Sequence, residues 1–171
     1  RLDRVEARLR IIEKEGSMPE HEIVIKQIDP VSGVGCRDRM PITGIAEFIG
    51  DVMGGVMMNG LAPSAPPMVL YHDPEFDPEA VDATFLVPTV GEPSGTTPAG
   101  RTLEAASVPG GEMAVLIHVG PYESIGEAYQ ALGAWFAAEG RTGAGPACEV
   151  YLTRPEDPGD PVTEIRMALA P

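Results

Sequence analysis

The sequence repeats its own pattern after 80 residues, and this duplication limits the folds that the chain can adopt. With the chain aligned to itself at that offset, eight positions are identical in one ungapped register. Most of them lie where turns or helix ends are expected, because backbone geometry restricts the residue there. A period this long indicates two similar halves and not a solenoid. The identical pairs are Pro41/Pro121, Ile45/Ile125, Glu47/Glu127, Gly60/Gly140, Pro66/Pro146, Tyr71/Tyr151, Asp77/Asp157 and Pro78/Pro158.

Each half predicts the same order of elements, namely a strand, a turn, a second strand, a helix and two further strands. The expected helices span 42–60, with Thr43 as N-cap and Gly60 as C-cap, and 124–140, with Ser124 as N-cap. The expected strands lie over 21–41, on both sides of a turn at Asp29-Pro30, and over 66–73, 81–89, 101–109, 111–119, 147–155 and 163–170.

Two halves of this kind, 21–90 and 101–171, predict an α+β domain joined by a linker at 91–100. We expect duplicated βαββ-type halves, tandem SHS2-like, related by a pseudo-twofold axis. Their strands would form one curved antiparallel sheet with two helices on one face. The groove between the halves is the expected place for a pocket.

An N-terminal helix is expected over 1–16, before this domain. Leu2, Val5, Leu9 and Ile12 follow one another at spacings of 3, 4 and 3, which is an a/d seam. Two heptads fit either the end of a dimerising coiled coil or a short helix packed on its own domain.

Charge and composition exclude several function classes. The net charge of -14 argues against nucleic acid as a partner of this segment and disfavours anionic membranes, whereas cationic ligands suit it. No apolar run approaches the roughly 18 residues of a membrane span. Cys36 and Cys148 are too few for a disulfide framework or a zinc site, and predict reduced thiols in a cytoplasmic protein. No metal-ligand spacing or nucleotide-binding motif occurs, so neither a metal nor a cofactor is expected.

Three segments near the C-terminus carry a family resemblance: "HVGPYESIGEAYQALGAWFAAEG" (118–140), "EVYLTRPED" (149–157) and "TEIRMALA" (163–170). Together they resemble the GyrI-like small-molecule-binding domain, and the resemblance extends over 21–171. Such domains serve as effector-binding domains of MerR-type and AraC-type transcription regulators, including multidrug sensors. The helix over 1–16 is similar to the end of the coiled coil that precedes the effector domain in MerR-type regulators.

The resemblance also implies where a ligand would bind. In the family, a glutamate on the last strand lies at the floor of an aromatic-lined pocket, and Glu164 matches that motif position. Tyr122 and Tyr151 correspond to the pocket aromatics, and Trp135 lies on the matching helix. On the residues alone, Glu164 is either such an anchor or the partner of Arg166 in an ion pair at a solvated edge.

Further candidates for the pocket wall come from the first half. Tyr71 is the duplicate of Tyr151, and either tyrosine fits a structural role in the core equally well. The helix over 42–60 carries an apolar stripe that packs on the sheet or, through its methionines, adapts to dissimilar ligands. Gly54-Gly55 predicts a mobile segment there unless close packing requires small residues. The stripe residues proposed to line the pocket are Phe48, Val52, Met53 and Val56.

The resemblance therefore predicts the ligand-sensing effector-binding domain of a transcription regulator. Its ligands would be aromatic or cationic drug-like molecules bound between the halves. The N-terminal helix would hold a homodimer, and DNA would be contacted only by a head domain absent from this chain. One alternative is a stand-alone hydrolase of cyclopropane-containing genotoxins, with Glu164 as base and Trp135 beside it. Another is an acidic protein that inhibits a partner enzyme.

Overall fold

The computed structural model describes residues 21–171, so the helix predicted over 1–16 lies outside the described residues. The described part contains eight strands and two α-helices, each helix preceded by one turn of 3-10 helix. In chain order these are β1 (Val24–Ile28), β2 (Val31–Met40), η1 (Ile42–Gly44), α2 (Ile45–Met58), β3 (Met68–Tyr71), β4 (Val81–Pro88), β5 (Glu104–Val108), β6 (Gly111–Val119), η2 (Tyr122–Ser124), α3 (Ile125–Glu139), β7 (Gly143–Tyr151) and β8 (Val162–Leu169).

All eight strands form one antiparallel sheet in the order β1-β6-β8-β7-β3-β4-β2-β5. The first and second halves of the chain meet where β3 pairs with β7, with Met68 opposite Val150 and Tyr71 opposite Ala147. On either side of this junction the strand order is the same, β3-β4-β2 in one direction and β7-β8-β6 in the other. The predicted α+β class and the single antiparallel sheet are confirmed.

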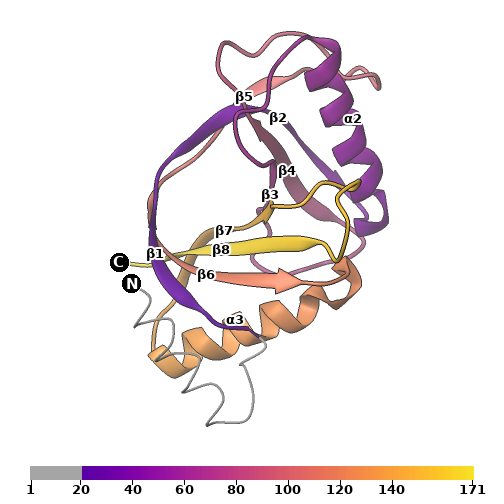
Figure 1. Cartoon of the computed structure of the whole chain (residues 1–171). Helices are drawn as coiled ribbons and strands as arrows, with labels where there is room; N and C mark the ends of the chain where they lie inside the picture. Colours follow the sequence, from indigo (N-terminus) through magenta and orange to yellow (C-terminus); the bar gives the residue numbers. More distant parts are fainter. Residues whose placement is uncertain (1–20) are drawn as a thin grey trace.

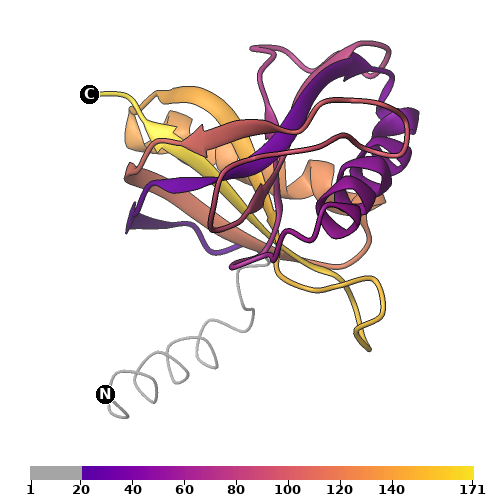
Figure 2. The same cartoon turned by 90° about the horizontal axis from the view of Figure 1, so that it is seen from above.

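The outer strands are exchanged between the halves. β1 pairs with β6 and β2 pairs with β5, and both ladders keep one register, from Val24 opposite Val115 to Gly35 opposite Glu104. β1–β2 is therefore one long strand with a kink, which pairs with the equally kinked β5–β6. The turn expected at Asp29-Pro30 was wrong, because the chain keeps its direction there and continues the same ladder. Because this two-stranded ribbon connects the two ends of the sheet, the sheet curls into a half-barrel (Figure 1). The view from above shows the indigo β1–β2 segment running across the molecule beside β5–β6 (Figure 2).

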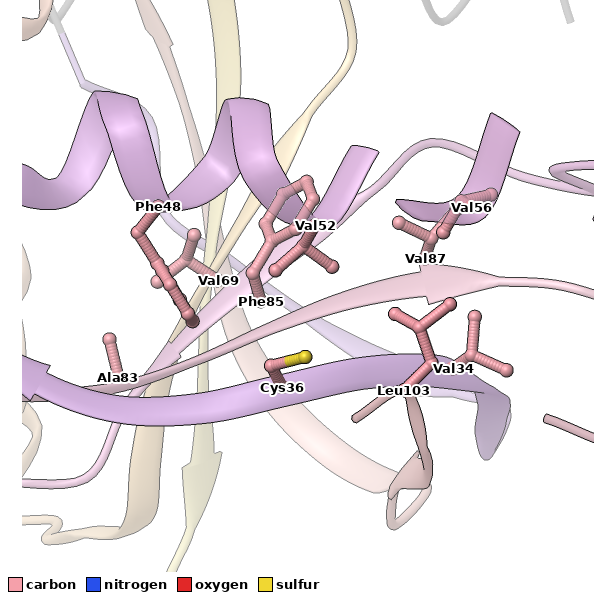
Figure 3. Packing of buried hydrophobic residues seen from close by; sticks show 10 residues of the cluster. All are labelled: Val34, Cys36, Phe48, Val52, Val56, Val69, Ala83, Phe85, Val87 and Leu103. Atoms are coloured by element: carbon pink, nitrogen blue, oxygen red, sulfur yellow. The ribbon is translucent and has the colours of Figure 1, made fainter. Parts of the chain in front are cut away.

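Helix α2 covers the part of the sheet formed by the first half. Its apolar stripe places Phe48, Val52 and Val56 on the sheet, where all three side chains are buried (Figure 3). Val34 on β2 and Phe85 on β4 are among the strand residues that they contact. These burials supply most of the packing that holds α2 to the sheet, since helix propensity alone contributes little.

Helix α3 packs on the second half through Ala128, Leu132 and Phe136, against a cluster that includes Leu116 and Ile165. The sheet residues under the two helices share one face because alternate residues of a strand point to the same side. The opposite face carries its own buried cluster of Met68, Leu70, Leu86, Cys148 and Val150. Both helices thus lie on one face, as predicted.

The helix starts differ from the expectation. Thr43 does not cap α2: its N-cap is Gly44, and no side-chain hydrogen bond caps it. Ser124 does occupy the N-cap position of α3, but its hydroxyl donates to the carbonyl of Pro121 and accepts no hydrogen bond from an N–H of the helix. In each half a proline carbonyl accepts the N–H three residues later and forms a 3-10 turn, so a backbone bond begins the helix.

Gly54-Gly55 in α2 is explained by close packing. The linker passes over the helix here, and a Cβ at Gly55 would lie 3.0 Å from the Cα of Thr97, while one at Gly54 would lie 3.2 Å from Pro98. The linker is held by further bonds, among them the Asp51 carboxylate accepting from the Ala99 N–H at 2.8 Å. Small residues are therefore required where the linker crosses α2. Because close packing explains Gly54 and Gly55, the two glycines no longer indicate a mobile segment.

This packing predicts opposite effects of two glycine-to-alanine changes in one helix. Gly50 has no atom within 4 Å of an added Cβ, so Gly50→Ala should raise the free energy of unfolding by about 0.5–1 kcal/mol through helix propensity. Gly55→Ala should lower the free energy of unfolding, although the helix propensity improves by the same amount, because the added Cβ would be too close to Thr97. Urea denaturation measures both. A stabilising Gly55→Ala would contradict the close approach of the linker.

Candidate functional site

A carboxylate lies buried where the two halves meet. Glu149 on β7 is only 5% exposed. The hydroxyl of Tyr129 on α3 donates to its Oε2 at 2.6 Å, and the hydroxyl of Tyr151 donates to its Oε1 at 3.2 Å. Val69 on β3 is its cross-strand partner, so Glu149 lies directly at the junction of the halves.

Strand alternation explains this position. In the run Cys148-Glu149-Val150-Tyr151, Cys148 and Val150 face the buried cluster on the face without helices. Glu149 and Tyr151 therefore face the helices, two residues apart on one side of β7. Tyr129 reaches the same point from α3, whose neighbouring residue Ala128 is fully buried.

Two further tyrosines complete the surroundings of Glu149. Tyr122, in the turn before α3, meets the ring of Tyr151 edge-on with 5.7 Å between the ring centres. Tyr71 packs against the same core as Tyr151. Burial raises the pKa of Tyr71, and the nearby charge of Glu149 raises it further. We refer to Glu149 with Tyr71, Tyr122, Tyr129 and Tyr151 as the tyrosine site.

The environment of the Glu149 carboxyl combines burial with hydrogen bonds and lacks an ion pair to lysine or arginine within residues 21–171. Burial raises the pKa of its carboxyl above the ordinary value of 4.5, while the hydrogen bonds from Tyr129 and Tyr151 and the proximity of His118 act in the opposite direction. Among residues 21–171 no lysine or arginine forms an ion pair with it. Burial thus makes the charged form of this carboxylate less favourable, and a cation beside it would offset that cost.

Glu164 lies elsewhere. It pairs across the sheet with Val150, so it faces the side without helices, away from the tyrosine site. Its Oε1 accepts a hydrogen bond from Arg166 Nε at 2.6 Å, and the two side chains are 11% and 18% exposed. Of the two roles that the residues allowed for Glu164, the ion pair with Arg166 is the arrangement present.

The other predicted site residues lie at three locations on the helix-covered face of the sheet. The structure brings Tyr71, Tyr122 and Tyr151 together around Glu149. Trp135 is half-buried, packs against the cluster under α3 and meets the ring of Phe136 edge-on at 5.2 Å. Because Trp135 lies on the helix-covered face, it does not meet Glu164. Phe48, Val52, Met53 and Val56 all belong to the core between α2 and the sheet.

Sequence reasoning missed Glu149 and Tyr129. A signal for Glu149 was present, since it is a single carboxylate within the otherwise apolar strand run "ACEVY" and lies two residues before a tyrosine. Such a residue must point into the protein on one face of the strand. Tyr129 had no comparable signal, because an aromatic residue on a helical stripe is as typical of the core.

The carboxylate of the tyrosine site is shielded from solvent, since Glu149 is 5% exposed. Surface hollows of about 230 Å³ and 260 Å³ lie instead along β5, and both are lined by Ala105, Ala106 and Ser107. Neither includes Glu149. At the tyrosine site Tyr122 is the exposed member, with 47% of its surface accessible, and it covers Tyr151.

Other kinds of site find little support in the described part of the chain. Within residues 21–171 no group of three His, Cys, Asp or Glu side chains is placed to hold a metal ion. Across the same residues, the helices are too short or too polar to cross a bilayer. Cys36 and Cys148 are free and buried, and burial raises the pKa of Cys148 to about 12, so its thiol is unreactive.

Comparison with solved structures finds the same fold in proteins of different function. EcmrR in a complex with DNA matches with a TM-score of 0.78 and 24% identity, over 98% of this chain and 64% of that chain. Its C-terminal domain alone matches with a TM-score of 0.71 and 23% identity, over 88% of this chain and 98% of that domain. The chain therefore spans about two thirds of EcmrR.

More distant matches include an enzyme and a ligand complex. A hydrolase from Listeria innocua matches with a TM-score of 0.62 and 14% identity, over 92% of this chain and 96% of that one. SAV2435 bound to tetraphenylphosphonium matches with a TM-score of 0.60 and 15% identity, over 87% of this chain and 94% of that one. At these identities the matches establish the fold alone. No curated protein sequence matches the chain.

The curled antiparallel sheet with two helices on one face is the architecture that these matches share with the chain. The model of the GyrI-like small molecule binding domain matches residues 21–170, and the chain belongs to that family.

Proposed function

We propose that this chain is a ligand-sensing domain that binds lipophilic aromatic cations at the tyrosine site. The observation that carries the proposal is Glu149, a buried carboxylate that accepts hydrogen bonds from two tyrosine hydroxyls and has no ion-pair partner within residues 21–171. The proposal replaces Glu164 by Glu149 as the anchor, because Glu164 is already paired with Arg166.

A cation suits this site for two physical reasons. It would neutralise a carboxylate that burial alone makes unfavourable in its charged form. Aromatic faces also attract cations, with a strength that grows when water is excluded. Tyr71, Tyr122 and Tyr151 provide such faces beside Glu149. The bound tetraphenylphosphonium of SAV2435, a protein of the same fold, is a lipophilic cation and supports this ligand class.

A ligand can reach Glu149 only if one of the side chains that shield it from solvent moves. Tyr122 is the candidate, because it is the exposed tyrosine and lies in the short turn between Gly120 and α3. Gly120 has a φ of +135°, which a residue with a side chain rarely adopts, so this glycine allows the chain to reverse direction beside Tyr122. We propose that Tyr122 moves away from Tyr151 as the ligand binds.

The role in transcription is part of the same proposal. EcmrR, which shares the fold, was solved in complex with DNA, and this chain corresponds to about two thirds of it. The a/d seam over 1–16 would join the domain to a partner copy, and a DNA-binding head would precede it in the full-length protein. Ligand binding would then act on DNA binding through the dimer. The separation of Trp135 from Glu164 gives the hydrolase alternative no geometric support.

Calorimetric titration of the chain with tetraphenylphosphonium tests the proposal. We expect saturable binding to one site per chain. A raised pKa means that part of the free protein carries a proton on Glu149 just above pH 4.5, and a bound cation favours the carboxylate. Binding should therefore weaken as the pH falls through this window and should release up to one proton. Absence of saturable binding, or the same affinity across the window, would contradict the assignment.

The same pKa gives a sign for stability in the absence of ligand. Between the ordinary value of 4.5 and the raised value, the folded protein binds more protons at Glu149 than the unfolded chain does. The contribution of this group to the free energy of unfolding is thus fully present below pH 4.5 and falls as the pH rises through the folded pKa. Denaturation curves recorded from pH 4.5 upward for the wild type and for Glu149→Gln measure this contribution of Glu149 to the free energy of unfolding.

A further inference from the structure

Two buried polar atoms beside the tyrosine site have no hydrogen-bond partner within residues 21–171. They are Nδ1 of His118 and Oγ1 of Thr163. The residues are 3% and 0% exposed, so water does not compensate for the missing bonds. Leaving such an atom unpaired costs about 1–3 kcal/mol. Two of them next to each other point to a partner that the free domain lacks.

The two residues are neighbours on the face that carries Glu149. Thr163 on β8 pairs with His118 on β6 at one side and with Tyr151 on β7 at the other. Residues paired in this way have Cβ atoms about 4.5–5.5 Å apart. The side chain of Tyr122 lies close to Thr163, although the two do not meet the geometry of a hydrogen bond. His118 is also close enough to lower the pKa of Glu149.

The contacts of His118 determine whether its unpaired Nδ1 atom donates or accepts a hydrogen bond. Its Nε2 lies 3.1 Å from the carbonyl oxygen of Pro121, which can only accept, and 3.3 Å from the hydroxyl of Ser124, which donates its own hydrogen to that carbonyl. The hydrogen of the neutral ring is therefore assigned to Nε2. In the neutral ring Nδ1 is then an acceptor. The ring is held in place by the stacked ring of His21, at 6.0 Å between centres. The hydroxyl of Thr163 is free to donate or accept.

We propose that His118 and Thr163 form a polar subsite for a hydroxyl group of the ligand. One hydroxyl can donate to Nδ1 of His118 and accept from the hydroxyl of Thr163, which satisfies both atoms at once. The inference rests on the proposed function, because the cationic part of the same molecule would be held by Glu149. The ligand class becomes a lipophilic aromatic cation that carries an alcohol.

A pair of isosteric probes tests the subsite. [4-(Hydroxymethyl)phenyl]triphenylphosphonium and (4-ethylphenyl)triphenylphosphonium have the same charge and shape and differ by a hydroxyl in place of a methyl group. We expect the alcohol to bind the wild-type chain about tenfold more tightly, the effect of roughly one to two well-placed hydrogen bonds. Calorimetry measures both affinities.

Substitutions at two threonines locate the effect. Thr163→Val should abolish the preference for the alcohol, and Thr163→Ser should restore it. Thr89→Val is the matched control, since the Thr89 hydroxyl is also buried and unpaired but lies beside a hollow along β5. It should leave the preference unchanged. Thr163→Val should not lower the thermal stability, because the hydroxyl that it removes has no partner in the free domain.

The outcomes separate this inference from the proposed function. Equal affinities of the two probes for the wild type, with both lost in Glu149→Gln, would overturn the subsite and leave the cation site in place. A preference that survives Thr163→Val, or a strong loss of stability in that variant, would also overturn it. If neither probe binds the wild type, both proposals fail.

Discussion

Glu149→Gln should reduce the affinity of the chain for tetraphenylphosphonium by about thirtyfold or more. The change keeps the shape of the side chain and removes its charge, and truncating one partner of a buried charge pair typically costs 2–5 kcal/mol. The variant should still fold. It loses a charge whose burial is unfavourable, and the amide oxygen can still accept from Tyr129 or Tyr151. Calorimetry gives the affinity, and a thermal melt verifies folding.

Glu164→Gln is the matched control for this experiment. It makes the same chemical change on the opposite face of the sheet, where Glu164 is paired with Arg166. We expect its affinity to stay within about twofold of the wild type, because Glu164 lies on the face of the sheet opposite the tyrosine site. The reverse result, with affinity lost in Glu164→Gln and kept in Glu149→Gln, would restore the anchor expected from the family motif.

Gly35→Ala should destabilise the fold by about 3 kcal/mol, near the upper end of the usual effect of overpacking. A Cβ at Gly35 would overlap the carbonyl oxygen of Phe85 on β4 and lie 3.0 Å from its carbonyl carbon and 3.2 Å from the Cα of Leu86. All three are backbone atoms, and β2 is held between β4 and β5, so neither strand can shift easily. Chemical denaturation measures the loss.

A glycine in open space provides the comparison. Gly133 in α3 has nothing within 4 Å of an added Cβ, so Gly133→Ala should raise the free energy of unfolding by about 0.5–1 kcal/mol. If Gly35→Ala were as well tolerated, the close approach of β2 to the backbone of β4 at Gly35 would not be required for the fold. The segment "GVGCRDR", which has no nucleotide-binding pattern, would then lack a structural explanation for its glycines.

The duplication does not extend to the site, and this asymmetry has a functional consequence. At the offset of 80 residues, Glu149 corresponds to Val69 and Tyr129 to Ile49, so the first half has apolar residues where the second has the carboxylate and its donor. Among the residues of the tyrosine site, only Tyr151 has an identical counterpart at this offset, Tyr71. Each chain therefore carries a single tyrosine site at the junction of two similar halves.

The sequence by itself determined the architecture. Although the turn expected at Asp29-Pro30 is instead a kink in one long strand, the 80-residue repeat and the alternation of apolar residues were enough to predict two halves, one antiparallel sheet and both helices on one face. These features are local or periodic, and each is expressed in consecutive residues. The helix caps were the local error, because backbone bonds to Pro41 and Pro121 replaced the side-chain caps expected at Thr43 and Ser124.

Only the tertiary structure decided which glutamate is buried among the tyrosines. Glu149 and Glu164 both lie on strands near the C-terminus, and the motif favoured the later one. Their faces depend on how β7 pairs with β8, where a shift of one residue would exchange the two sides. The exchange of β1 and β5 between the halves was likewise invisible in the letters. Such pairings join residues far apart in the chain, and no local pattern records them.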